Sequence, residues 1–122
     1  MVLTGDRYRE LMAQALGVDL TRTLITVKLV RYDPGSWIGP HTDVMATVAS
    51  HIIQLNLYWK AEWGGGLRLL PPSHSHEVAH TVLPDHRTSI AFLRSNISWH
   101  EVQPIVEGAP VSRTTLVVHL HK

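Results

Sequence analysis

The sequence predicts an all-β sandwich or barrel with one α-helix at its N-terminal end. Seven short segments rich in β-branched residues follow one another, and turn-forming residues separate them. One amphipathic segment precedes all of them. The chain has 122 residues, 44% of them hydrophobic, which is enough for one domain with one core. We therefore expect a single domain over residues 1–122, with a helix at 5–17 and a β core at 21–120.

The helix is predicted from apolar residues that are spaced to form one face. Within "GDRYRELMAQALGVDL" (5–20), the residues at i, i+3, i+4, i+7 and i+8 are Tyr8, Leu11, Met12, Ala15 and Leu16. Gly17 is typical of the position just past a helix end. Because the apolar face needs a partner surface, we expect the helix to pack on the outside of a sheet.

The strands are predicted from β-branched runs that end at turn residues. The first is "TLITVKLVRY" (23–32), and the Asp-Pro-Gly turn at 33–35 ends it. Further strands are expected within 46–59, 66–71, 77–84, 88–94, 99–105 and 113–120. The three glycines at 64–66 indicate a tight turn or a close approach of two backbones. They do not form a phosphate loop, because the lysine and the following helix are missing.

Composition excludes several function classes. The formal net charge is +1 and the basic residues are scattered, so we expect no nucleic-acid partner. No segment approaches the roughly 20 apolar residues that span a membrane, and the N-terminus lacks a signal-peptide pattern. The chain has no cysteine, which removes disulfides and thiolate sites and fits the cytoplasm. With nine histidines, any transition-metal site must use imidazole and carboxylate ligands.

The stretch "RYDPGSWIGPHTDV" (31–44) places His41 and Asp43 two residues apart. In a strand these side chains share a face, so they could form two corners of a metal site. His100, in "SWHEVQPI", offers a third corner, and Arg113 opens the last strand. Two histidines and one carboxylate suit mononuclear non-haem iron. An arginine nearby could hold a carboxylate in two-pronged fashion. Each residue alone has an ordinary structural reading; their order and spacing together favour the site.

The other seven histidines are not expected to bind metal. His74, His76 and His80 cluster in a segment that prolines and serines mark as a surface loop, where histidine is usually solvated. His119 and His121 share one strand face near the C-terminus and either face the barrel or lie exposed. The remaining two, His51 and His86, stand alone in the sequence.

Three stretches together match the pattern of one known family. "RYDPGSWIGPHTD" has a tyrosine–x–x–glycine lead-in to His-x-Asp. "LNLYWKAEWGGGLRLL" has Leu-Asn-x-x-Trp running into Trp-Gly-Gly-x-Leu, and "SWHEVQPIVEGAPVSRTTLVV" has a distal histidine, Val-x-Pro and a basic residue on the last strand. In these stretches, which span residues 28 to 118, the chain resembles the Fe(II)/2-oxoglutarate-dependent dioxygenases, particularly their prolyl-4-hydroxylase-like branch.

The resemblance implies a fold and a reaction. The fold is a double-stranded β-helix, a jelly roll of two antiparallel sheets. His41, Asp43 and His100 would bind Fe(II), and Arg113 would pair with the C5 carboxylate of 2-oxoglutarate beside the Thr115 hydroxyl. With O2, 2-oxoglutarate would yield succinate and CO2 while a substrate C–H bond is hydroxylated. Halogenases of the superfamily replace the carboxylate ligand with a small residue, so the retained Asp43 favours hydroxylation.

The chain departs from the branch in several places. Gln54 stands where a tyrosine often holds the co-substrate, so either Gln54 or another residue takes that role. Asn56 could bond the co-substrate or a buried backbone group. Gly66 stands where glutamate is usual, and the segment between His100 and Arg113 is longer than expected. The chain is also short for the family. It is therefore a minimal core, a core that a homodimer or partner subunit completes, or a truncated chain.

The substrate is expected to be a small molecule or an amino-acid or peptidyl side chain, and fold-level analogy does not choose among these. Trp37 and Trp99 lie beside the motifs and are predicted to line the substrate pocket. Arg31 could meet an anionic substrate. Trp59 and Trp63 are expected to pack in the core instead.

Two other function classes stay open. A cupin-like module would bind a metal without redox turnover, and its ligand pattern is faintly echoed by the His-x-His-Glu run at 74–77. A degenerate jelly roll would have only a structural role, which the four intact site residues disfavour. Substitution of His100 separates an active metal site from a structural domain.

Overall fold

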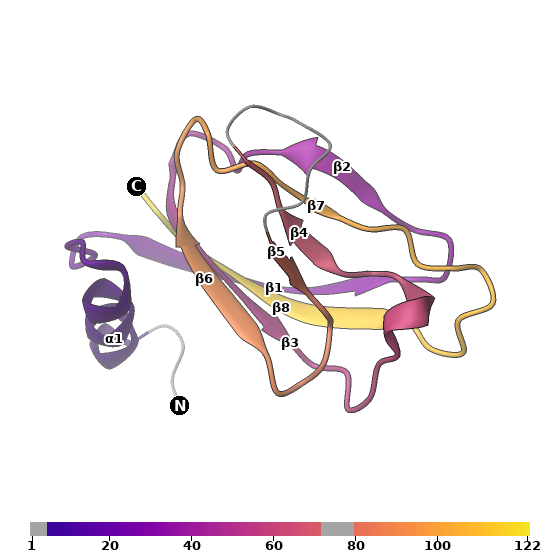
Figure 1. Ribbon diagram of the computed structural model, residues 1–122. Helices are drawn as coiled ribbons and strands as arrows, with labels where there is room; N and C mark the ends of the chain where they lie inside the picture. The colour runs from indigo at the N-terminus through magenta and orange to yellow at the C-terminus, as the bar shows by residue number, and fades with distance from the viewer. Residues whose placement is uncertain (1–4, 72–79) are drawn as a thin grey trace.

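Eight strands in the described part of the chain form two four-stranded antiparallel sheets (Figure 1). The computed structural model describes residues 5–71 and 80–122. The major sheet has the order β1 (Leu24–Tyr32), β8 (Arg113–His121), β3 (Thr47–Gln54) and β6 (Ser89–Leu93). The minor sheet has the order β2 (Ile38–His41), β7 (His100–Val102), β4 (Leu67–Leu69) and β5 (His80–Val82). The predicted jelly-roll fold of two antiparallel sheets is confirmed.

The helix α1 (Asp6–Leu16) lies outside the major sheet, as predicted (Figure 1). It is one residue shorter at each end than the expected 5–17. Gly17 takes a left-handed conformation with φ 71°, and its N–H donates to the Ala13 carbonyl. Tyr8 and Met12 are buried against the sheet, where they join the core cluster of Ala49, Val118 and Leu120. No described helix is long and apolar enough to cross a membrane.

Strand β2 was not among the strands expected from the sequence, although His41 and Asp43 were expected to share one face of a strand. Its four residues include Gly39 and Pro40, both poor strand formers, so local propensity gives no signal. The strand forms because it pairs with β7. Ile38 lies opposite Val102, and His41 lies opposite His100, with a register shift between the two pairs. The strand expected within 46–59 is β3, which ends at Gln54.

The glycine run between the 3-10 helix η1 (Ala61–Trp63) and β4 brings two backbones together, as predicted. Gly64 and Gly65 both have φ 72°. A Cβ atom on Gly64 would lie 2.1 Å from the Pro104 carbonyl oxygen, so no side chain fits there. Trp59 packs beside this turn with Trp63, and its indole N–H donates to the Gly64 carbonyl at 2.8 Å. The run therefore fixes how η1 lies against the segment that follows β7.

The two sheets enclose a core and, beside it, a cavity. A cluster of four buried side chains joins the inner faces, namely Ile52, Leu67, Val82 and Val102. Side chains alternate between the two faces of a strand, so every second residue of β8 points inward. The cavity begins where these inward positions become polar. Its walls include the three predicted metal ligands together with Arg113 and Thr115.

Candidate active site

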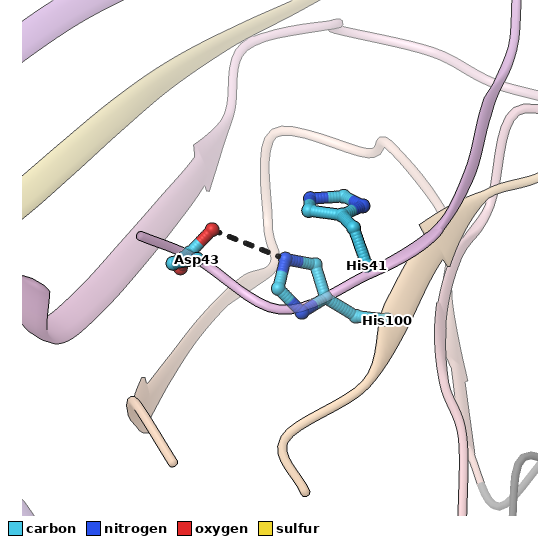
Figure 2. A group of neighbouring side chains, drawn as sticks. All are labelled: His41, Asp43 and His100. Atoms are coloured by element: carbon cyan, nitrogen blue, oxygen red, sulfur yellow. Dashed lines mark ion pairs between the residues drawn. The ribbon is translucent and has the colours of Figure 1, made fainter. Parts of the chain in front are cut away.

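The pairing of β2 with β7 brings two histidines together. His41 and His100 are directly opposed in the ladder, and their ring centroids lie 4.2 Å apart. Asp43 follows two residues after the end of β2. One ligand atom from each of His41, Asp43 and His100 lies within 4.8 Å of the others, and Figure 2 shows the three side chains converging. The structure thus assembles the two-histidine, one-carboxylate set that the sequence predicted.

Backbone carbonyls set how the two imidazoles are oriented. Nδ1 of His41 lies 2.9 Å from the Gly39 carbonyl oxygen, and Nδ1 of His100 lies 3.0 Å from the Ser98 carbonyl oxygen. A carbonyl only accepts, so each Nδ1 carries the hydrogen and donates it. This leaves Nε2 of each ring directed away from the carbonyl, and a metal would bind there in place of a proton.

Asp43 is held by side chains rather than by the strand pleat that the sequence suggested, because β2 already ends at His41. The Ser50 hydroxyl donates to Oδ2 of Asp43. The Arg94 Nε donates to the Asp43 backbone carbonyl at 3.0 Å. Nε2 of His100 lies 3.5 Å from Oδ1, the contact drawn in Figure 2. These three contacts come from three parts of the chain, and they hold Asp43 in place although it lies in a loop.

The electrostatics keep Asp43 ionised. Burial alone would raise the pKa of this carboxyl group, but hydrogen bonds from His100 and Ser50 and the nearby charges of His100 and His119 lower the pKa to about 2. At neutral pH the group is therefore a carboxylate, and its lone pairs face the same point as the two imidazoles. A divalent transition-metal cation such as Fe(II) suits this mixed nitrogen and oxygen set.

A cavity of about 310 Å³ extends from these three ligands between the sheets. Both sheets contribute to its walls, which are largely apolar, with Val30, Ile38, Ile52, Leu67, Val102 and Val117. The cavity is also lined by Arg113 and Thr115 at the start of β8, and by Tyr32 at the end of β1. The cavity therefore joins a metal-ligand cluster to a buried cation.

Arg113 is almost fully enclosed, with 2% of its surface exposed. Its guanidinium lies 5.3 Å from the centre of the Tyr32 ring. Burial lowers its pKa to about 10, and Tyr32 opposes this shift, so the group is still a cation at neutral pH. Its buried Nε has no hydrogen-bond partner among the described residues. A buried cation with an unused donor is a site for an anion.

Two further predicted residues lie near Arg113 with unused polar atoms. Thr115 is fully buried and lines the cavity, and its hydroxyl has no hydrogen-bond partner in the part described. Gln54, directly opposite Thr115 in the β3–β8 ladder, has both amide atoms buried and unpartnered within the same residues. Buried polar groups are nearly always satisfied, so these atoms are available to a polar ligand in the cavity. A carboxylate of 2-oxoglutarate fits Arg113 and Thr115 in charge and in donors.

The other predicted residues lie elsewhere. The Asn56 side-chain amide donates to the Ser112 carbonyl and accepts from the Thr114 N–H, both at 2.8 Å. It therefore fixes the backbone at the start of β8. Trp37 and Trp99 are not among the residues that line the cavity, and Trp37 is 64% exposed. Arg31 lies on the surface, where its Nε donates to Asp33 at 2.6 Å.

Four residues with polar side chains line the cavity but were not predicted as site residues: Lys28, Tyr32, Ser50 and His119. The signal was present in the strand alternation. Positions 113, 115, 117 and 119 share one face of β8, so His119 faces the cavity with Arg113. Tyr32 lies opposite Arg113 in the β1–β8 ladder, and Ser50 lies opposite His119 in the β3–β8 ladder. Register between distant strands cannot be read from one sequence.

The other histidines are placed as follows. His74 and His76 lie outside the described residues. His80 is exposed on β5. His51 lies outside the cavity, and its Nδ1 forms a hydrogen bond of 2.7 Å with the Tyr8 hydroxyl. His86 is exposed, and its Nδ1 lies 3.1 Å from the Leu57 carbonyl oxygen.

Comparison with known proteins identifies the family and the fold. A family model described as the 2OG-Fe(II) oxygenase superfamily matches residues 27–121. A crystal structure of a Pseudomonas putida prolyl-4-hydroxylase matches with a TM-score of 0.74 and 24% identity, covering 96% of this chain and 61% of that one. A prolyl 4-hydroxylase structure from Phytophthora capsici matches with a TM-score of 0.63 and 24% identity, covering 80% of this chain and 32% of that one. The chain thus spans less than two thirds of either structure. No curated protein matches.

Proposed function

Because the chain belongs to the 2OG-Fe(II) oxygenase superfamily, we propose that it is an Fe(II)- and 2-oxoglutarate-dependent dioxygenase that hydroxylates a C–H bond. Its substrate is a small molecule or an amino-acid or peptidyl side chain, and the co-products are succinate and CO2. The two solved relatives are prolyl hydroxylases, but at 24% identity the likeness extends to the fold alone.

One observation carries the proposal. A two-histidine, one-carboxylate cluster and a buried arginine without a carboxylate partner in the described chain line one cavity. The three ligands would occupy one face of the metal, and the opposite face would stay open for 2-oxoglutarate and O2. Arg113 would hold the far carboxylate of 2-oxoglutarate in a charge-assisted pair. A structural domain has no need of a buried unpaired cation.

The side chains have separate tasks in this proposal. His41, Asp43 and His100 would hold the iron, and Ser50 keeps Asp43 ionised and oriented. Arg113 and Thr115 would position the co-substrate, and the apolar walls of the cavity exclude water from it. Bound iron and 2-oxoglutarate supply the oxidising chemistry with O2.

Succinate formation tests the proposal. Purified protein with Fe(II), 2-oxoglutarate and O2 is expected to form succinate slowly without substrate, and faster when a substrate is present. Succinate formation should be lost in His100→Ala, whereas His86→Ala removes an exposed imidazole outside the cavity and should leave it unchanged. Metal binding without succinate from any candidate substrate would instead support a binding module of the cupin type.

A further inference from the structure

The cavity contains a second cationic group besides Arg113. We propose that Lys28 and His119 form a second anion site, which binds the carboxylate of a small organic acid that is the substrate. This inference rests on the proposed function and gives the substrate its chemical class. The substrate is then a small acid rather than a peptide.

The strand register places the two residues together. In the β1–β8 ladder Lys28 lies opposite Val117 and Thr26 lies opposite His119, so Lys28 and His119 are diagonal neighbours on the inner face. Long side chains in this relation can reach a common ligand. Both residues line the cavity. A carboxylate between them could accept from the Lys28 ammonium and from an imidazole N–H of His119.

This pair is separate from the Arg113 site. Tyr32 lies opposite Arg113 on β1, and Lys28 comes four residues before Tyr32. Four residues of strand span about 13 Å, so the carboxylate site between Lys28 and His119 and the site at Arg113 lie in different parts of the cavity. Arg113 is therefore left to the co-substrate, and Lys28 to a different anion.

The charges in the cavity also leave Lys28 without a partner. No described carboxylate lies within 4.0 Å of its ammonium group. The charged residues that line the cavity in the described chain are Lys28, Asp43 and Arg113. A divalent metal, Asp43, Arg113 and dianionic 2-oxoglutarate together carry no net formal charge. One positive charge then remains on Lys28, which is exposed on β1 and therefore open to an anionic group that enters the cavity.

The position of His119 sets how far the carboxylate lies from the reacting carbon. Nε2 of His119 lies 3.9 Å from Oδ2 of Asp43, a metal ligand in the proposed site. A carboxylate bound to His119 is therefore close to the metal, and the C–H bond must lie within a few bonds of it. The cavity volume of about 310 Å³ is at the lower end for ligand pockets, and the co-substrate shares it. Both points favour a small acid.

Binding of a matched probe pair tests the site without turnover. Butanoate and butanamide have nearly the same shape but differ in charge. Calorimetry uses the full chain loaded with Zn(II) and 2-oxoglutarate. We expect wild type to bind butanoate about tenfold more tightly than butanamide, in the range of one charge-assisted hydrogen bond. Lys28→Met should remove this preference, Lys28→Arg should keep most of it, and His119→Phe should weaken it.

Two control variants separate a specific role of Lys28 from an effect of net charge and from an effect on the 2-oxoglutarate site. Lys60→Met removes a lysine that pairs with Glu62 outside the cavity, so it tests for an effect of net charge alone. Arg113→Met should weaken 2-oxoglutarate binding and leave the butanoate preference intact. Equal binding of the two probes by wild type, or an equal loss in Lys60→Met, would overturn the inference. So would a loss of 2-oxoglutarate binding in Lys28→Met but not in Arg113→Met.

A peptide probe and the co-substrate titration complete the test. Binding of acetyl-Gly-Asp-Gly-amide without binding of butanoate would overturn the assignment to a small acid. Failure of wild type to bind 2-oxoglutarate would contradict the proposed function, and the probe pair measured on metal-free protein would then decide the Lys28 site by itself.

Discussion

Arg113 is buried without a protein counterion, since no described carboxylate lies within 4.0 Å of it. Such a group lowers stability unless something pairs with it. The fold tolerates it next to Thr115 and Gln54, whose buried polar atoms are also unpartnered within the described chain. At the scale of single residues, this cost in stability is expected if the group serves the proposed anion site.

Ser50 acts on the titration of Asp43, which gives a prediction about pH. The folded pKa of Asp43 is about 2, below its usual 3.8, so its stabilising contribution is present above pH 3.8 and is lost as pH falls through about 2. Ser50→Ala removes one hydrogen bond to the carboxylate and raises that pKa. We expect the metal-free variant to be about 1 kcal/mol less stable than wild type at pH 6.

The difference in unfolding free energy between wild type and Ser50→Ala should shrink as pH falls from 4 to 2, because the protonated carboxyl group of Asp43 no longer depends on Ser50. Urea denaturation at several pH values measures it. A difference that is the same at pH 6 and at pH 2 would contradict the role of Ser50 in holding the ionised form.

At the scale of elements, the helix and seven of the eight strands could be predicted because each carries its own pattern. The α1 periodicity and the β-branched runs are local signals. Strand β2 carries none, since it exists only through pairing with β7. The inward position of His119 likewise depends on the register of β8. Asp43 was predicted as a ligand, but its support from Ser50 and Arg94 comes from distant residues that one sequence does not connect.

The turn at Gly64 should tolerate no side chain. Gly64→Ala places a Cβ 2.1 Å from the Pro104 carbonyl oxygen at φ 72°, so we expect a loss of about 3 kcal/mol or more in unfolding free energy. Gly108→Ala is the matched control, because nothing lies within 4 Å of its Cβ position. Denaturant unfolding of both variants measures the effect, and equal stabilities would show that the two backbones can separate without cost.

Tyr8 anchors α1 to the major sheet by its hydrogen bond to His51. Burial raises the pKa of Tyr8 to about 12, so the stability from the protonated phenol is complete below pH 10 and is lost as pH rises through about 12. Tyr8→Phe should cost about 1 kcal/mol at pH 7, and the gap to wild type should close above pH 10. Tyr58 is 61% exposed, so Tyr58→Phe should change neither the stability at pH 7 nor its dependence on pH. Thermal unfolding across pH 7 to 11 checks this, and a gap that widens at high pH would contradict it.

At the scale of the whole molecule, the two sheets are joined by one apolar cluster beside the cavity, so ligands that fill the cavity should stabilise the entire fold. A ligand at 100 times its Kd adds about 2.7 kcal/mol, which for a chain of this size raises Tm by about 10 °C. We expect Zn(II) with 2-oxoglutarate to produce such a shift, and a chelator to reverse it. A Tm unaffected by either addition would mean that the cavity is not a ligand site.

The measurement that tests the central claim most directly is an anaerobic titration with Fe(II) and 2-oxoglutarate, followed by visible absorption. The claim is that His41, Asp43 and His100 hold iron while Arg113 holds the co-substrate. Wild type should develop a charge-transfer band that requires both additions. Asp43→Ala and Arg113→Met should lose it, and Asp33→Ala, which removes an exposed carboxylate, should keep it. A band that survives in Asp43→Ala, or that never forms in wild type, would contradict the site described.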